Sequence, residues 1–199
     1  PDKSELTLTL DPDRQEKIEK RLARHRNAHS AVVIVDAATG AVRVFAQHTQ
    51  ADDPAGKRHA PSSARQPAAS VIKIVTAAAL LEAGVQSTDT TCFHGGMRGL
   101  TKWHLKPRPQ FDKRCETLTQ ALANSSNVVF ARRALQHLQT GALAAKAKDF
   151  LFGVPLDFDV QGRASRFVEG KGDLRRAKAA AGFKGARMSP IHGAVIGAA

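Results

Sequence analysis

The order of apolar and polar positions predicts strands and helices mixed along the chain. Residues 5–10, ELTLTL, alternate apolar and polar side chains, as a short strand does. Asp11 and Pro12 are predicted to begin a surface helix, with Asp11 as its N-cap. The apolar segments 30–36 and 41–47 are separated by a four-residue turn, so they are predicted to pair as an antiparallel hairpin.

A second helix is predicted from Pro67 to about Ala83, ended by Gly84. It is apolar on nearly every side, which is typical of a central, buried helix. Lys73 is the exception, and Ser70 is on the same helix face because the two residues are one turn apart.

The remaining chain is predicted to contain long loops and short helices. Loops are predicted at 48–64, 86–114 and, for the most part, 153–187. Thr117 and Gln120 have the spacing of a capping box, so a helix begins there. Four poor helix formers at 124–127, NSSN, interrupt it before a further helix follows. Ser189 and Pro190 begin an apolar helix that has no C-terminal cap.

The composition fits one globular domain or a large part of one. The chain has 199 residues, 42% of them hydrophobic and 24% charged. It has no apolar run of 18 residues, so no membrane-spanning helix is predicted. Because the first residue is Pro1 and not Met, we expect the natural protein to begin earlier, with any export signal or anchor outside these residues.

The net charge is +12, from 30 Lys and Arg against 18 Asp and Glu. Such a charge favours anionic partners. The basic residues are scattered, however, and aromatic residues make up 5% with no Tyr, so the sequence lacks the pattern on which bases stack. Binding of nucleic acid is therefore the weakest interpretation of this sequence, and nucleic acid is not an expected partner.

Cys92 and Cys115 have three interpretations from spacing alone. They can form one disulfide if the protein is exported, or they can stay as free, buried thiols. A zinc site would add His94 and His104, although this spacing matches no common structural zinc pattern.

Ser70 and Lys73 suggest acyl-transfer chemistry. Burial disfavours the charged form of a lysine, so the pKa of Lys73 is expected to fall and its amine to accept a proton. Ser70 is placed at a helix N-terminus, where backbone N–H groups stabilise developing negative charge. The alternative is a chance Ser-x-x-Lys pattern in which Lys73 extends to the surface.

Ser125 and Asn127 form a second pattern, Ser-x-Asn, at the predicted helix break. Polar side chains at a break point away from the helical hydrogen-bond ladder, although an N-cap for the next helix explains them equally well. The two patterns together are more specific than either alone.

In type, order and spacing, these two patterns resemble the first two motifs of penicillin-binding protein transpeptidase domains. Further similar stretches are LTLTLDPDRQEKIEKRL, AVVIVDAATGAVRVFA and GARMSPIHGAVIGAA. The resemblance implies an α+β fold with an antiparallel sheet between helices. It also implies that residues 1–199 are the N-terminal and central part of a single transpeptidase domain.

The resemblance assigns a role to each motif residue. Ser70 would be the acylated nucleophile, Lys73 its general base and Ser125 a proton relay, while Asn127 would hold the substrate amide. The substrates would be the D-Ala-D-Ala end of a peptidoglycan stem peptide and an amine of a neighbouring strand. β-Lactams would acylate the same serine, and no cofactor is implied.

The family's third motif, Lys-Thr-Gly or Lys-Ser-Gly, is missing from the sequence. The pairs Lys171-Gly172 and Lys184-Gly185 precede the last helix, whereas the family motif follows it. We therefore expect the motif and three sheet strands beyond residue 199. This piece alone would then have an open sheet edge and an incomplete, inactive site.

The family also implies a location and alternatives. The protein would be extracytoplasmic, at the periplasmic face of the membrane, with its anchor outside these residues and other cell-wall synthesis proteins as partners. Export makes a Cys92–Cys115 bridge more plausible. Glu169 lacks the Asn of a β-lactamase deacylation segment, which favours a long-lived acyl-enzyme. Carboxypeptidase activity, and a non-catalytic scaffold or β-lactam sensor, remain the alternatives.

Overall fold

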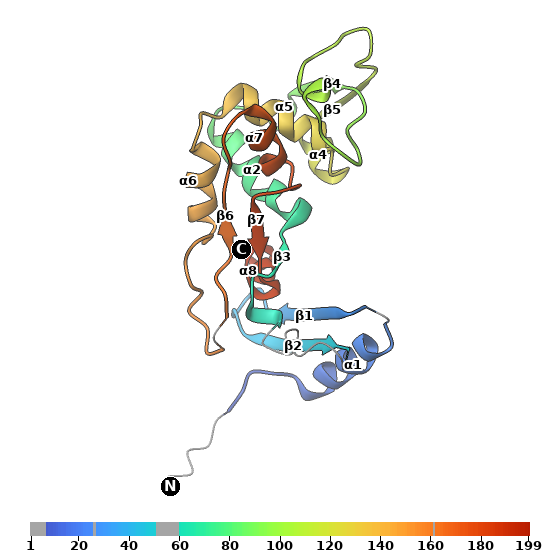
Figure 1. The fold of residues 1–199 in the computed structure, drawn as a ribbon. Helices are drawn as coiled ribbons and strands as arrows, with labels where there is room; N and C mark the ends of the chain where they lie inside the picture. Colours follow the sequence, from blue (N-terminus) through green and yellow to red (C-terminus); the bar gives the residue numbers. More distant parts are fainter. Residues whose placement is uncertain (1–6, 26, 51–59, 161) are drawn as a thin grey trace. The chain divides into compact units, whose positions relative to one another are not determined.

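The computed structural model describes residues 7–25, 27–50, 60–160 and 162–199 (Figure 1). The chain forms two compact units. The first comprises Pro1–Arg65, Leu156–Ala164 and Ser189–Ala199, and the second comprises Gln66–Pro155 and Ser165–Met188.

The first unit is built on a two-stranded antiparallel hairpin. Strand β1 (His29–Val35) pairs with β2 (Val42–Thr49), which confirms the predicted hairpin. Helix α1 (Pro12–Ala23) packs against β2, and α8 (Pro190–Ala198) packs against β1 and the short 3₁₀ turn η1 (Ala60–Ser62). The core between α1 and the hairpin is apolar: Leu22, Val44 and Ala46 are buried there, with Ile18, Val32 and Ile34 packed against them.

The entry to α1 agrees with the sequence only in part. Asp11 caps the helix, since its carboxylate accepts a hydrogen bond from the backbone N–H of Arg14 at 3.0 Å. The strand predicted at 5–10 is wrong where it can be checked, because 7–10 form no strand, and 5–6 lie outside the described residues. In its place, the backbone N–H of Asp11 donates to the Arg43 carbonyl (2.9 Å) and the Thr9 hydroxyl donates to the Val42 carbonyl (2.8 Å), which ties this segment to β2.

The second unit is a cluster of helices around α2 (Ile72–Glu82). The helices packed against it are α4 (Leu118–Ala123), α5 (Asn127–His137), α6 (Ala142–Asp149) and α7 (Asp173–Ala180). Neighbours on several sides explain why α2 has no polar face. The predicted start of this helix at Pro67 is wrong: Pro67 lies in a strand, and Ala69–Val71 form a 3₁₀ turn, η2, before the α-helix begins. The positive φ of Ala69, +47°, breaks the right-handed helical path at that point.

Two small antiparallel sheets complete the second unit. Strands β3 (Gln66–Pro67), β7 (Ala186–Met188) and β6 (Arg166–Phe167) form one sheet in that order. Strands β4 (Thr90–Phe93) and β5 (Arg114–Thr117) form a hairpin whose long connection contains helix α3 (Lys102–Leu105).

The loop predictions for 86–114 and 153–187 are therefore too broad. The first stretch contains β4 and α3, and the second contains β6, α7 and the beginning of β7. Helix α7 was missed because it follows Gly172, and glycine in a sequence usually indicates a loop. In the structure Gly172 has a φ of +82° and directly precedes the helix.

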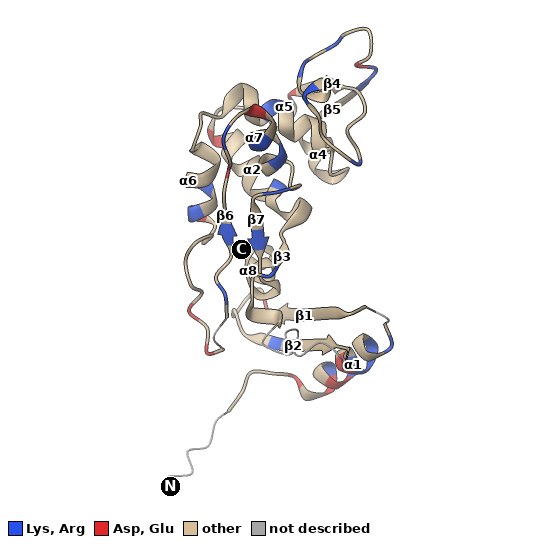
Figure 2. Cartoon of the chain, viewed as in Figure 1, with Lys and Arg blue, Asp and Glu red and all other residues tan. Residues whose placement is uncertain are grey.

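The α+β fold class is confirmed by this mixture of helices and small antiparallel sheets. Within the described residues, no helix has both the length and the apolar character needed to span a bilayer. Lys and Arg are spread over elements of both units (Figure 2).

Candidate active site

Ser70 is presented by the strained turn η2. The preceding Ala69 has a φ of +47°, in the left-handed region, and Ser70 itself is an exposed residue. The backbone of Gly182 approaches this turn so closely that a Cβ there would lie 2.2 Å from the Ala69 carbonyl oxygen. The turn is also tied to β7, because the backbone N–H of Ala68 donates to the Ala186 carbonyl at 3.1 Å. Packing therefore holds the serine in place.

Lys73 is fully enclosed, with 1% of its surface exposed. Its Nζ is 2.9 Å from Ser70 Oγ, 3.0 Å from Ser125 Oγ and 2.8 Å from Asn127 Oδ1. Burial lowers the pKa of Lys73 to about 8, because the ammonium form loses hydration that the neutral amine does not need. The sequence prediction of a lowered pKa is thus supported, and Lys73 does not extend to the surface.

Ser125 lies in the break between α4 and α5 and has a φ of +55°. Its Oγ is 2.9 Å from Ser70 Oγ. The two hydroxyl oxygens and the Lys73 amine nitrogen therefore form a triangle whose sides are all hydrogen-bond distances.

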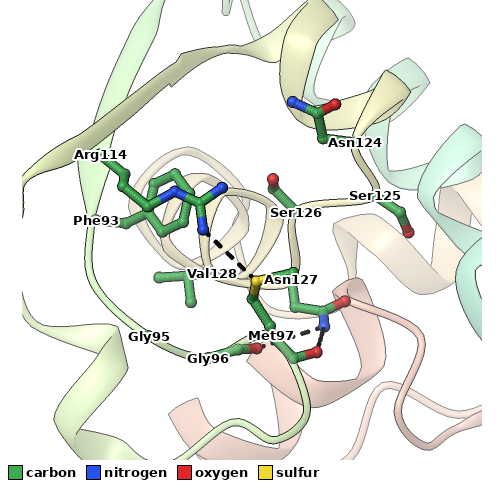
Figure 3. Close-up of a pocket in the computed structure, with 10 residues that line it drawn as sticks. All are labelled: Phe93, Gly95, Gly96, Met97, Arg114, Asn124, Ser125, Ser126, Asn127 and Val128. Atoms are coloured by element: carbon green, nitrogen blue, oxygen red, sulfur yellow. Dashed lines mark hydrogen bonds between the residues drawn. The ribbon is translucent and has the colours of Figure 1, made fainter.

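Asn127, the first residue of α5, holds this triangle from the other side. Its Oδ1 accepts from Lys73. Its Nδ2 donates to the Met97 carbonyl at 2.8 Å and lies 3.4 Å from the Gly96 carbonyl (Figure 3). Because the amide has a partner at each end, its orientation is fixed. The structure thus brings together all four residues singled out from the sequence.

This arrangement can move a proton. An ammonium group has three hydrogens, which match the three oxygen acceptors around Lys73. The neutral amine has two hydrogens and a lone pair, so one of the two serine hydroxyls must then donate to it. A hydroxyl that donates to an amine at 2.9 Å is placed for general-base activation.

Residues 30–198 match the family described as the penicillin binding protein transpeptidase domain. The chain belongs to this family. A comparison with curated protein sequences finds no significant match.

Solved penicillin-binding protein structures share the fold. The imipenem acyl-enzyme complex of penicillin-binding protein A from M. tuberculosis has a TM-score of 0.74 and 21% identity, covering 96% of this chain and 50% of that one. The D,D-transpeptidase domain of a peptidoglycan glycosyltransferase from Eggerthella lenta has a TM-score of 0.77 and 22% identity, covering 95% and 52%. PBP2 from Pseudomonas aeruginosa, in complex with WCK 5153, has a TM-score of 0.77 and 20% identity, covering 96% and 50%. The chain thus spans about half the length of these relatives.

Cys92 and Cys115 of this penicillin-binding protein domain are opposite each other in the β4–β5 register and form a disulfide. They therefore have no thiolate to offer, which removes the zinc site considered with His94 and His104. His94 instead contacts the carboxylate of Asp112, with Nδ1 2.5 Å from Oδ1.

Arg132 is a buried residue that the sequence did not reveal. It donates to the backbone carbonyls of Cys92, His104 and Lys106 at 2.7–2.9 Å and pairs with Asp112 at 2.8 Å. Hydrogen bonds from Arg132 hold the pKa of the Asp112 carboxyl well below its usual range. Arg132 thus fastens α5 to the loop that contains Gly96 and Met97, the carbonyl partners of Asn127.

A pocket of about 310 Å³ lies beside Asn127 (Figure 3). The apolar residues Phe93, Met97 and Val128 line it, together with Arg114. It is large enough to hold part of a ligand bound next to Ser70, Lys73 and Ser125, which we call the serine–lysine group.

Proposed function

We propose that this domain contributes the nucleophile and proton-transfer groups of a serine D,D-transpeptidase that cross-links peptidoglycan stem peptides. The observation that carries the proposal is the position of Lys73 Nζ, within hydrogen-bond distance of both Ser70 Oγ and Ser125 Oγ. Membership of the transpeptidase family supports the same reaction class.

The proposed reaction has two halves. Ser70 Oγ attacks the carbonyl carbon between the two D-Ala residues, and its proton passes to Lys73. The C–N bond breaks, Ser125 protonates the leaving D-Ala amine, and Lys73 returns a proton to Ser125. An amine from a neighbouring stem peptide then attacks the ester, loses a proton through the same groups, and Ser70 regains its hydrogen. The net change is one amide exchanged for another.

β-Lactams would enter by the first half of this reaction. Attack by Ser70 opens the lactam amide, and the amine stays tethered to the acyl group, so it does not diffuse away. In both reactions Asn127 would bind the substrate. An amide N–H of the stem peptide or of the β-lactam side chain would donate to one lone pair of Asn127 Oδ1, while the other lone pair accepts from Lys73.

We also propose an extracytoplasmic location, at the periplasmic face of the membrane. The Cys92–Cys115 disulfide supports it, because such bridges persist in oxidising compartments.

Penicillin labelling of the full-length gene product tests the enzyme proposal. We expect a stable adduct by intact mass and by fluorescent penicillin, which disappears in Ser70→Ala and persists in Ser87→Ala, a serine outside the site. Release of D-Ala from a stem pentapeptide, with a product formed on an added amine, then separates a transpeptidase from a β-lactam sensor. Absence of any adduct on the folded wild-type protein contradicts the proposal and favours the scaffold alternative.

A further inference from the structure

Glu116 is a second buried acidic residue near the site, and neither motif includes it. It lies on β5, and 9% of its side chain is exposed. A carboxylate with so little access to water needs hydrogen-bond donors from the protein. The Ser126 hydroxyl donates to its Oε2, and Asn124 Nδ2 donates to its Oε1 at 3.3 Å. The guanidinium of Arg114 is 3.7 Å from Oε1.

The two donors are the residues on either side of Ser125. Ser125 has a φ of +55°, a conformation that residues with a Cβ rarely adopt without outside support. Two backbone bonds support this conformation locally, because the N–H groups of Ser125 and Ser126 donate to the carbonyls of Leu122 and Ala121, as in helices that end on a left-handed residue. They do not fix the side chains on either side of Ser125. Glu116 does so, because one carboxylate holds the residue before Ser125 and the residue after it.

The strand that carries Glu116 is itself well fixed. Its neighbour Cys115 is bridged to Cys92 on the paired strand, and Glu116 is opposite Thr91 in the register. The next residue, Thr117, begins α4 with a capping box to Gln120. The carboxylate is therefore supported on a rigid element, as a group that orients another must be.

We infer that Glu116 is a positioning residue, which holds Ser125 in its left-handed conformation through Ser126 and Asn124. The inference rests on the proposed acyl-transfer function. In that conformation the Ser125 hydroxyl lies 3.0 Å from Lys73 Nζ and 2.9 Å from Ser70 Oγ. Without Glu116 the break relaxes, and Ser125 leaves its place between the nucleophile and the base.

Acylation kinetics of Glu116→Ala and Glu116→Gln in the full-length gene product test this inference. Fluorescent penicillin at several concentrations separates the dissociation constant of the initial complex from the first-order acylation rate constant. We expect Glu116→Ala to lower the rate constant about 10- to 100-fold, as loss of alignment does, and to leave the dissociation constant unchanged. Glu116→Gln should give a smaller loss, because its amide oxygen still accepts from one of the two donors.

A double-mutant cycle identifies the route of the effect. If Glu116 acts through Ser126, Glu116→Ala combined with Ser126→Ala loses less than the product of the single losses. Strict multiplication of the two losses would show independent effects and overturn the inference.

Glu169→Gln is the matched control. Glu169 has the same side-chain exposure, 9%, and a partly buried cationic partner, Arg176, at 2.9 Å, but within the described residues no hydrogen bond or ion pair joins it to Ser70, Lys73 or Ser125. The Glu169→Gln variant should be acylated by penicillin at the wild-type rate. Thermal unfolding of every variant selects those with a cooperative transition, and if Glu116→Ala does not fold, Glu116→Gln and Ser126→Ala carry the test.

The outcomes separate two kinds of failure. Wild-type acylation in folded Glu116→Gln and Ser126→Ala overturns the positioning role and leaves the enzyme proposal standing. A comparable rate loss in Glu169→Gln overturns it too, since the effect would then be a general response to lost buried charge. If the wild-type protein is never labelled, it is the enzyme proposal that fails.

Discussion

Lys73 Nζ lies 2.8 Å from Asn127 Oδ1, slightly closer than it lies to either serine hydroxyl. The closest partner of the buried amine is thus a neutral amide and not a carboxylate. A neutral acceptor satisfies an N–H group without the strong preference for the charged form that a carboxylate would add. Burial therefore lowers the pKa of Lys73 to about 8, and the Asn127 amide does not counteract that shift as a carboxylate would.

The pH dependence of acylation reports the state of Lys73. With a pKa of about 8, the neutral amine is the minor form at lower pH. We expect the acylation rate constant to rise about tenfold per pH unit up to that value and then to level off, as general-base catalysis requires. Labelling rates between pH 5.5 and 9.5 measure it, and a flat profile would show that Lys73 is not the base.

The same lowered pKa affects stability with a definite sign. An unfolded lysine has a pKa of about 10.4, so between about 8 and 10 the unfolded chain binds more protons than the folded chain. The contribution of Lys73 to the free energy of unfolding therefore increases as pH rises through that window. In Lys73→Met, urea unfolding at pH 7 and pH 9.5 should show this increase removed.

Asn127→Asp replaces the neutral acceptor by a carboxylate. A negative charge 2.8 Å from Nζ stabilises the ammonium and raises the pKa of Lys73. The rising part of the pH profile of acylation should therefore move to higher pH by about one unit or more, the size of shift that a close opposite charge produces. Asn127→Ala is the control: it removes the same hydrogen bond without charge, so an equal upward movement in that variant would refute the explanation.

Gly182→Ala tests the support of the Ser70 turn. The added Cβ would lie 2.2 Å from the Ala69 carbonyl oxygen, so the turn must move. We expect a loss of about 1–3 kcal/mol in the free energy of unfolding, as overpacking gives, together with slower acylation. Gly153→Ala is matched, with a φ of +89° and no atom within 4 Å of the new Cβ, so it carries the backbone strain without the clash. Equal effects of the two changes would show that strain alone is responsible.

Arg132→Met should be among the most destabilising single changes in the second unit. It leaves the Asp112 carboxylate, with 5% of its side chain exposed, without its cationic partner. Breaking a buried pair in this way costs about 3–5 kcal/mol. Urea unfolding measures it against Arg133→Met, the neighbouring arginine, whose partners are Thr91, the Thr90 carbonyl and the His137 ring. A loss no larger than in Arg133→Met would contradict the assignment of Arg132 as the buried centre of this loop.

Acid should weaken the same contact. The pKa of Asp112 is lowered by Arg132, so its stabilisation is complete above the unfolded value of about 4 and is lost as pH falls below it. Between pH 5 and pH 2 the wild type should lose more stability than Asp112→Asn, as followed by thermal unfolding.

Local signals in the sequence predicted local structure well. The Asp11 cap, the Thr117 capping box and the β1–β2 hairpin each depend on residues close in sequence, and each is present. The grouping of Ser70 with Ser125 is different, because no local rule brings residues 55 apart together. That expectation came from the order and spacing of two motifs.

The parts that were missed depend on long-range contacts or on backbone conformation. Nothing around Glu116 or Arg132 in the sequence indicates their partners, which come from other segments. The left-handed φ of Ala69 was equally hidden, since Gly is the residue that usually signals such a position. For this reason the sequence placed the start of α2 five residues early.

The left-handed turn at Ala69 also says where this protein can be made more robust. Among the described residues, three non-glycine positions have positive φ, and two of them, Ala69 and Ser125, belong to the candidate site. The domain therefore has some of its least favourable backbone geometry next to its reactive groups, as proteins that trade stability for activity do. Ala69→Gly should relieve the backbone strain and raise thermal stability, because glycine adopts positive φ without steric cost. The same change should let the Ser70 turn move more. Selection for heat resistance and selection for rapid acylation should therefore favour different residues at position 69.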